Sequence, residues 1–258
     1  MGMSSLDGSV GIVTGGARGI GAACARKMAA EGARVVLADR LEDELNRTCG
    51  EIGELATAHV VDLKSELGVA GLIEETVRAN GRLDFIVQNA AVQIEKPLHE
   101  TTTEDWEHLH AVNLRAVFWG AKYAITHMLS RPGGGAIVNV GSVMSVASDP
   151  ILAAYSTMKH GVLGLTRSIA VNKTYARAGI RANCICPGDV MTDMQVAYWS
   201  TLADPSKGRE AIEAHYPGGQ ISLPTDIAEV ACFLASSASR MVSGAELVVD
   251  GGRLPLYY

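Results

Sequence analysis

Short apolar runs alternate with helix-length segments along the chain, and this alternation restricts the fold more than any other feature. Seven runs rich in β-branched residues lie at 10–14, 33–38, 57–61, 83–88, 136–140, 180–185 and 246–249. Each is too continuous for a strand with one solvent-exposed face, as expected of parallel strands covered by helices on both sides. The sequence therefore predicts an α/β fold, with a doubly wound parallel sheet of seven strands in one domain over residues 1–258.

The segments between these runs carry apolar residues at three- and four-residue spacing. Residues 67–80 and 227–238 are clear examples and are predicted to be helices. Thr225 followed by Asp226 indicates an N-cap and an acidic first turn. Thr102, with Asp105 three residues later, predicts a capping box at the start of another helix.

One long segment, residues 188–222, interrupts this alternation. It follows a strand and contains scattered apolar and aromatic residues. Ligands of open α/β sheets bind beyond the carboxyl ends of the strands, so we expect this segment to be a substrate lid. A surface loop without a role in binding is the alternative. The side chains that the segment offers to a ligand are Met191, Met194, Tyr198, Trp199, Leu202, Lys207, Arg209 and His215.

Charge and composition exclude several classes of function. The net charge of −6 leaves no basic excess for nucleic acid, and no apolar stretch is long enough to span a bilayer. The first residues show no basic and apolar leader, so we expect a cytoplasmic protein. Cys184 and Cys186, two residues apart on one strand, are expected to be buried free thiols, and His108 and His110 ordinary surface histidines. No metal site is predicted.

The stretch TGGARGIG, from Thr14 to Gly21, joins the first apolar run to a helix-length segment. Its glycines do not have the spacing G-x-G-x-x-G, but their position between strand and helix suits a loop that binds phosphate at a helix N-terminus. The second run is followed at once by Asp39, 18 residues after Gly21. An acidic residue at about this separation hydrogen-bonds the adenosine ribose of a dinucleotide.

Tyr155 and Lys159 lie four residues apart, which places them on one helix face. An unperturbed tyrosine has a pKa near 10, and a neighbouring ammonium is expected to lower it toward the working range of a base. Ser142 follows the fifth run, where its hydroxyl can meet a substrate oxygen.

Together these motifs resemble the short-chain dehydrogenases/reductases, from about Leu6 to Gly252. The family's T-G-x-x-x-G-I-G matches Thr14–Gly21, and its Y-x-x-x-K matches Tyr155 and Lys159. Its active-site asparagine and serine match Asn113 and Ser142, and its adenine-contacting aspartate matches Asp62. Its P-G-x-x-x-T segment matches Pro187, Gly188 and Thr192, and the closing ELVVDGG resembles its last strand and turn. Gln88 and Ala91 depart from its N-N-A-G.

The resemblance implies a Rossmann fold and hydride transfer between a nicotinamide cofactor and a carbinol carbon. Tyr155 would be the base, Lys159 would lower its pKa and hold the ribose, Ser142 would polarise the substrate oxygen, and Asn113 would anchor a relay water. The implied cofactor residues are Gly15, Arg18, Gly19, Ile20, Gly21, Asp39, Arg40, Asp62, Leu63, Asn89, Ala90, Tyr155, Lys159, Pro187, Gly188, Val190 and Thr192. The expected substrate residues are Gln93, Met144, Leu152, Met191 and Tyr198.

The cofactor prediction is NAD, because Asp39 can accept hydrogen bonds from an unsubstituted ribose. Arg18 and Arg40 favour NADP instead, and we expect Asp39 to prevail. The expected substrate is a small secondary alcohol or ketone that is cyclic, sugar-like or a hydroxy acid.

The alternatives are an NADPH-dependent 3-ketoacyl-carrier-protein reductase and a non-catalytic nucleotide-sensing protein on the same fold. A serine hydrolase is disfavoured, because the G-x-S-x-G elbow is missing. The resemblance also implies a homotetramer, with a dimer as the alternative, and the tail RLPLYY is expected at a subunit interface.

Overall fold

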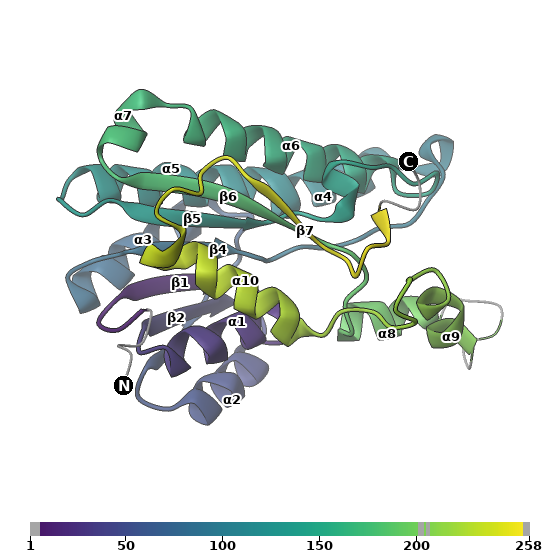
Figure 1. Ribbon diagram of the computed structural model, residues 1–258, viewed down its shortest axis with the longest axis horizontal. Coiled ribbons are helices and arrows are strands. Elements are labelled where there is room, and N and C mark those ends of the chain that lie inside the picture. Colours follow the sequence, from purple (N-terminus) through teal and green to yellow (C-terminus); the bar gives the residue numbers. More distant parts are fainter. Residues whose placement is uncertain (1–5, 201–203, 205–206, 255–258) are drawn as a thin grey trace.

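The computed structural model describes residues 6–200, 204 and 207–254. Seven strands form one sheet in the order β3-β2-β1-β4-β5-β6-β7, and every neighbouring pair is parallel (Figure 1). This confirms the predicted fold class. The strands are β1 Val10–Thr14, β2 Arg34–Asp39, β3 Ala56–Val60, β4 Phe85–Gln88, β5 Gly135–Val140, β6 Ile180–Pro187 and β7 Glu246–Val249. The chain order reverses between β1 and β4, where open sheets of this type bind ligands.

Helices cover both faces of the sheet (Figure 1). They are α1 Gly19–Ala30, α2 Glu42–Ile52, α3 Glu66–Asn80, α4 Thr103–His110, α5 Ala116–Leu129, α6 Ala153–Ala170, α7 Lys173–Arg177, α8 Asp193–Trp199, α9 Gly208–Glu213 and α10 Pro224–Ala235. One core cluster joins Met28 of α1 and Ile227 of α10 to the sheet. A second cluster joins Leu72 of α3 and Met128 of α5 to the opposite face.

Two strands differ from the prediction that all seven are covered on both faces. β1, β4 and most of β5 and β6 are buried, whereas the residues of β3 and β7 are all exposed or half-buried. β3 and β7 are the edges of the sheet, where a strand has a neighbour on one side only. A continuous apolar run therefore did not distinguish an edge strand from a central one.

The helix ends confirm one prediction fully and another only in part. The capping box at α4 is confirmed, because Thr102 Oγ1 accepts from the Asp105 amide at 3.1 Å and Asp105 Oδ2 accepts from the Thr102 amide at 3.0 Å. Thr225 is not an N-cap. Helix α10 already begins at Pro224, whose missing N–H suits the first helical position. The other half of that prediction is confirmed, because Asp226 lies in the first turn of α10, where it accepts from the amide of Leu223 at 2.7 Å.

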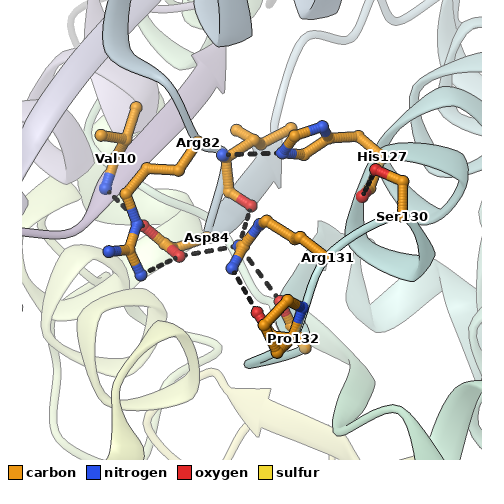
Figure 2. Close-up of polar contacts among 9 residues, drawn as sticks. Val10, Arg82, Asp84, His127, Ser130, Arg131 and Pro132 are labelled. Carbon is orange, nitrogen blue, oxygen red and sulfur yellow. Dashed lines mark hydrogen bonds and ion pairs between the residues drawn. The ribbon is translucent and has the colours of Figure 1, made fainter.

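A polar cluster around Asp84 closes the edge of the sheet at which the strands begin (Figure 2). The Asp84 carboxylate accepts from the Val10 amide at 2.9 Å and from Arg82 Nε at 2.7 Å. Arg131, after α5, donates to its other oxygen at 2.8 Å. These contacts tie the starts of β1 and β4 to the end of α5, at the opposite end from the residues expected to bind ligands.

The thiols Cys184 and Cys186 are buried on one face of β6 with their sulfur atoms 3.9 Å apart, as the spacing predicted. His108 and His110 are half-buried on α4 rather than exposed. In the part of the chain that the structure describes, no His, Cys, Asp or Glu side chains cluster in groups of three suited to a metal ion. Within the same described ranges, none of the helices combines the length and apolar character needed to cross a membrane.

Candidate active site

Two glycines of the turn between β1 and α1, Gly15 and Gly21, have no room for a side chain. Gly15 has a φ of +66°, and a Cβ there would lie 2.8 Å from Asn89 Nδ2. A Cβ on Gly21 would lie 2.0 Å from the carbonyl oxygen of Gly15. Helix α1 begins at Gly19 without a side-chain cap at Arg18, so its first N–H groups are available to an anion. This arrangement fits the pyrophosphate of a dinucleotide.

Residues after β4 brace this loop from the neighbouring strand. The amides of Asn89 and Ala90 donate to Thr14 Oγ1 at 3.0 and 3.2 Å, and Asn89 Nδ2 donates to the Thr14 carbonyl at 3.1 Å. Ala91 replaces the family's glycine in an ordinary conformation, because no described non-glycine residue has a positive φ. That departure therefore requires no change of the backbone.

The other departure, Gln88, takes part in a buried hydrogen-bond network that joins β4 and β5 to α6. Its Nε2 donates to Asn139 Oδ1 at 2.9 Å, and Asn139 Nδ2 donates to Thr166 Oγ1 at 2.8 Å. The Gln88 side chain also fills the space beside Gly120, where an added Cβ would lie 2.1 Å from Gln88 Oε1. The longer side chain is thus accommodated by a glycine on α5.

Asp39 stands at the end of β2 beside the glycine loop. Its carboxylate accepts backbone hydrogen bonds from Arg40 at 2.7 Å, Leu41 at 3.2 Å and Ala17 at 3.2 Å. Arg18 and Arg40, the two arginines that favour NADP, are both exposed, and Arg18 forms a 3.5 Å ion pair with Asp193. Asp39 is therefore held by backbone hydrogen bonds, whereas both arginines extend into solvent.

The remaining predicted cofactor residues lie along the same edge. Asp62 accepts from the Lys64 amide at 3.0 Å, Leu63 packs against the core, and Ile20 of α1 does so on the other face. Thr192 lies over the start of α1, since a Cβ on Gly19 would be 3.4 Å from its methyl group.

The segment after β6 leaves the sheet through a tightly packed turn. Pro187 ends the strand, and a Cβ on Gly188 would lie 2.8 Å from the Tyr216 hydroxyl. Val190 is buried and pairs with Ser222, whose carbonyl accepts from the Met191 amide at 2.9 Å. The two ends of the predicted lid thus meet, and Figure 1 shows α8 and α9 between them, to the side of the sheet.

Ser142, Tyr155 and Lys159 converge at the carboxyl end of β5. Ser142 precedes the short 3-10 helix η3 (Val143–Ser145) and is hydrogen-bonded to the Tyr155 side chain. Tyr155 and Lys159 share one face of α6 and are both buried, with the Lys159 Nζ atom 5.5 Å from the centre of the phenol ring. That ammonium donates to the Val140 carbonyl at 2.9 Å.

The pKa of Tyr155 differs from the prediction that Lys159 lowers it. Burial raises the pKa of the phenol to about 12, and only the hydrogen bond from Ser142 opposes this. Burial also lowers the pKa of Lys159 to about 8, because the interior penalises its charge. Desolvation is thus the largest influence on both pKa values in the protein alone.

Asn113 lies in an element that the sequence did not predict, the π-helix η2 (Ala111–Arg115) between α4 and α5. Its Oδ1 accepts from the Val92 amide at 2.8 Å and its Nδ2 donates to the Val92 carbonyl at 2.7 Å. The side chain therefore holds the loop after β4 against the active site. Such π-bulges are frequent at functional sites.

The predicted substrate residues fall into two groups. Met144 and Leu152 pack with the Tyr155 cluster, and Gln93 lies on the loop beside them, hydrogen-bonded to Glu95. Met191 instead lines a groove of about 760 Å³ along α1, near Arg18.

The side chains of the predicted lid differ in their exposure to solvent. Tyr198 is half-buried, Met194 and Lys207 are exposed, and Arg209 pairs with Glu213 at 2.9 Å. His215 is also exposed, Trp199 is half-buried, and Leu202 lies outside the described residues.

The sequence reading missed a group of ionisable residues beside these. They are Glu95, Asp149, Asp189, Tyr216 and Arg253. Their signal was the position of acidic residues after the ends of β4, β5 and β6, which is where a substrate meets the sheet.

Comparisons with known proteins agree with this geometry. The family model described as enoyl-(acyl carrier protein) reductase matches residues 15–253. A cis-4-hydroxycyclohexanecarboxylate dehydrogenase of Sinomonas cyclohexanicum is 39% identical over 94% of this chain and 95% of its own. An NADP-dependent (R)-specific alcohol dehydrogenase of Lentilactobacillus kefiri is 36% identical over 96% of this chain and 97% of its own.

A crystal structure of levodione reductase superimposes with a TM-score of 0.92 at 30% identity, covering 98% of this chain and all of the other. The family model extends from the glycine loop to the turn after β7, and the superposition also covers nearly the whole chain. The protein is a member of the short-chain dehydrogenase/reductase family, and its reaction is hydride transfer between a nicotinamide cofactor and a secondary alcohol or ketone.

Proposed function

We propose that the protein is an NAD-dependent dehydrogenase of a small cyclic or sugar-like secondary alcohol. The observation that carries the cofactor half of this proposal is the Asp39 carboxylate, held by three backbone amides at the end of β2. An acidic side chain at this point accepts hydrogen bonds from the two ribose hydroxyls of NAD.

The charges near Asp39 support NAD over NADP. A 2′-phosphate carries about −1.5 to −2 charges near neutral pH. Two unit charges about 4 Å apart repel by roughly 4 kcal/mol at an effective dielectric constant near 20. A charged hydrogen bond from an exposed arginine stabilises the bound phosphate by about 1.5–3 kcal/mol. The repulsion by Asp39 is therefore larger than the stabilisation by either Arg18 or Arg40.

The proposed mechanism uses the residues that meet at the end of β5. When bound, the nicotinamide ring supplies the acceptor for the hydride and a positive charge beside the phenol. Ser142 holds the substrate oxygen, and Tyr155, ionised in the oxidising direction, takes the hydroxyl proton as the C–H electron pair leaves the carbinol carbon. The products are the ketone and the reduced cofactor.

Two further residues support this step. Lys159 is the proposed partner of the nicotinamide ribose and of the phenolate, which offsets the effect of burial on the pKa of Tyr155. Asn113 positions the loop after β4 through Val92, and its role as anchor of a relay water stays a prediction.

The substrate half rests on the apolar wall around Tyr155, formed by Met144, Leu152 and Ile94. A ring or short carbon chain fits such a wall, and the relative named for hydroxycyclohexanecarboxylate acts on a ring alcohol. The alternative function is reduction of a 3-ketoacyl carrier protein with NADPH. A preference of the enzyme for NADPH and for acyl thioesters would indicate this alternative.

The test is a panel of secondary alcohols and ketones, followed at the absorbance of the reduced nicotinamide with each cofactor. We expect turnover of cyclic alcohols, with kcat/KM at least tenfold higher with NAD than with NADP. A preference for NADP would contradict the cofactor half. Lack of turnover with every alcohol and ketone would contradict the substrate half and favour a nucleotide-sensing protein.

We also propose a homotetramer. Exposed apolar side chains lie on two pairs of neighbouring elements, with Trp106 on α4 and Phe118 on α5, and with Phe233 on α10 and Val248 on β7. Two separate apolar surfaces suit an assembly with two kinds of interface. Light scattering should give about four times the chain mass of 27.1 kDa. The cytoplasmic location and the interface role of the C-terminal tail stay predictions, and residues 255–258 of that tail lie outside the described residues.

A further inference from the structure

Two loops join to form one wall beside Tyr155. The first follows β4 and the second precedes α6, and the Lys96 amide of the first donates to the Ile151 carbonyl of the second at 2.8 Å. Ile94 from the first and Met144 from the second both pack in the cluster that contains Tyr155. Polar groups carried by these loops therefore lie close to a bound substrate.

Glu95 is the half-buried acidic residue on this wall. Its Oε1 accepts from Gln93 Nε2 at 2.5 Å. Burial raises the pKa of Glu95, and the negative charges of Asp149 and Asp189 raise it further. Burial also raises the pKa of Tyr198 in the lid, and the negative charges of Glu95, Asp189 and Asp149 raise it further. The charges of three acidic groups thus act on this part of the lid.

The cations next to this wall are already matched by carboxylates. Arg253 forms an ion pair with Asp189, and its guanidinium stacks 5.3 Å from the ring centre of Tyr216. The Tyr216 hydroxyl donates to the same carboxylate at 2.7 Å. Lys96 pairs with Asp105 at 2.6 Å. The two loops therefore keep a net negative charge, which comes from Glu95 and Asp149.

This charge distinguishes between two kinds of substrate that fit the same apolar space. A carboxylate on the far side of the ring from the reacting carbon would meet Glu95 with like charge in a partly desolvated place, where repulsion is weakly screened. A hydroxyl group at that position can instead donate a hydrogen bond to the carboxylate, which is stronger than a bond between neutral groups.

We infer that Glu95 is a specificity-determining residue that selects uncharged polyhydroxy substrates, by accepting a hydrogen bond from a remote hydroxyl and by repelling a remote carboxylate. The inference rests on the proposed function and narrows its substrate class to diols and polyols. The inferred substrate preference differs from that of the relative named for a hydroxycyclohexanecarboxylate.

The test compares two ring alcohols that differ at one group. These are cis-4-(hydroxymethyl)cyclohexanol and cis-4-hydroxycyclohexanecarboxylate, each followed by formation of its ring ketone with NAD. We expect kcat/KM of the wild type to be at least tenfold higher for the diol. Glu95→Gln keeps the size of the side chain and its contact with Gln93, and should narrow that ratio at least fivefold, mainly by improving the carboxylate. Glu100→Gln, on an exposed turn of the same loop region, should leave the ratio unchanged.

A wild-type preference for the carboxylate, or an unchanged ratio in Glu95→Gln, would overturn the inference. Binding of the two alcohols to the enzyme with NADH, measured by calorimetry, gives the same comparison without turnover. A charge-dependent binding ratio in the absence of hydride transfer would support the role of Glu95 and contradict the proposed function alone, so the two failures are distinguishable.

Discussion

The carboxylate of Asp39 accepts a 3.2 Å hydrogen bond from the backbone amide of Ala17, which joins the end of β2 to the glycine loop. Asp39, which is proposed to bind the ribose, is thus hydrogen-bonded to the loop that is proposed to bind the pyrophosphate. Ribose and pyrophosphate are neighbours in a dinucleotide, so this contact fixes the spacing between the two binding groups.

Replacing Asp39 by serine should shift the cofactor preference toward NADP. The change removes the negative charge that repels a 2′-phosphate, so that Arg18 and Arg40 can bind it without this opposition. Calorimetric titration of NAD and NADP into wild type and variant measures the shift without a substrate. Asp43→Ser, on the first turn of α2, is the control and should keep the wild-type order. Tighter binding of NADP by the wild type would show that the arginines decide.

Replacing Tyr155 by phenylalanine should abolish most of the turnover. The ring and its packing remain, whereas the group proposed to carry the proton is lost, and general acid–base groups contribute about 10²–10⁴-fold. Steady-state assays should show this loss in kcat with little change in the affinity for NAD. Near-normal turnover of the variant would rule out Tyr155 as the base.

The buried ammonium of Lys159 should make stability depend on pH. The unfolded chain keeps this proton up to pH 10.5, whereas the folded protein releases it near pH 8. The unfolded state therefore binds more protons between these values, and the free energy of unfolding rises with pH by up to about 3 kcal/mol. Lys159→Met should lack this rise and be more stable than the wild type below pH 8.

Urea unfolding at pH 7, 8, 9 and 10 measures the difference between the two proteins. Both retain Tyr155, so its titration cancels in the comparison. Parallel pH profiles would contradict the burial of a charged lysine.

Gly120→Ala should destabilise the fold through Gln88. The added methyl would lie 2.1 Å from Gln88 Oε1, and the Gln88 amide is held because its Nε2 donates to Asn139. Overpacking of this kind costs about 1–3 kcal/mol. The shorter side chain of Gln88→Asn should reduce that cost in the double variant. Gly164→Ala is the matched control, because it lies in helix α6 with nothing within 4 Å of its Cβ position. An equal cost in both Gln88 backgrounds would refute the coupling.

The lid should become more ordered when ligands bind. Hydrogen exchange of peptides from α8 and α9 should slow on addition of cofactor and substrate, since closing segments exclude water from the reaction. Peptides from β5, which is buried in the sheet, report the unchanged core. Equal exchange with and without ligands would argue against a gating role.

The sequence predicted the sheet because continuous apolar runs have a direct physical cause in two-sided burial. It located Ser142, Tyr155 and Lys159 because their spacing follows helix and strand geometry. It did not predict the π-helix around Asn113, since an element of five residues is too short to show an apolar periodicity of its own. It also missed Glu95 and Arg253, whose roles depend on loops brought together by β4, β5 and the end of the chain.

The pairing of Val190 with Ser222 means that the segment between them leaves and re-enters the fold at one place. Its length can therefore change without altering the register of any strand, because neither end has to move. The sheet and the lid can then vary independently, the first under selection for stability and the second for substrate range. Splicing segments of different length between Thr192 and Ser222 is a direct way to redirect the enzyme while leaving its predicted cofactor residues in place.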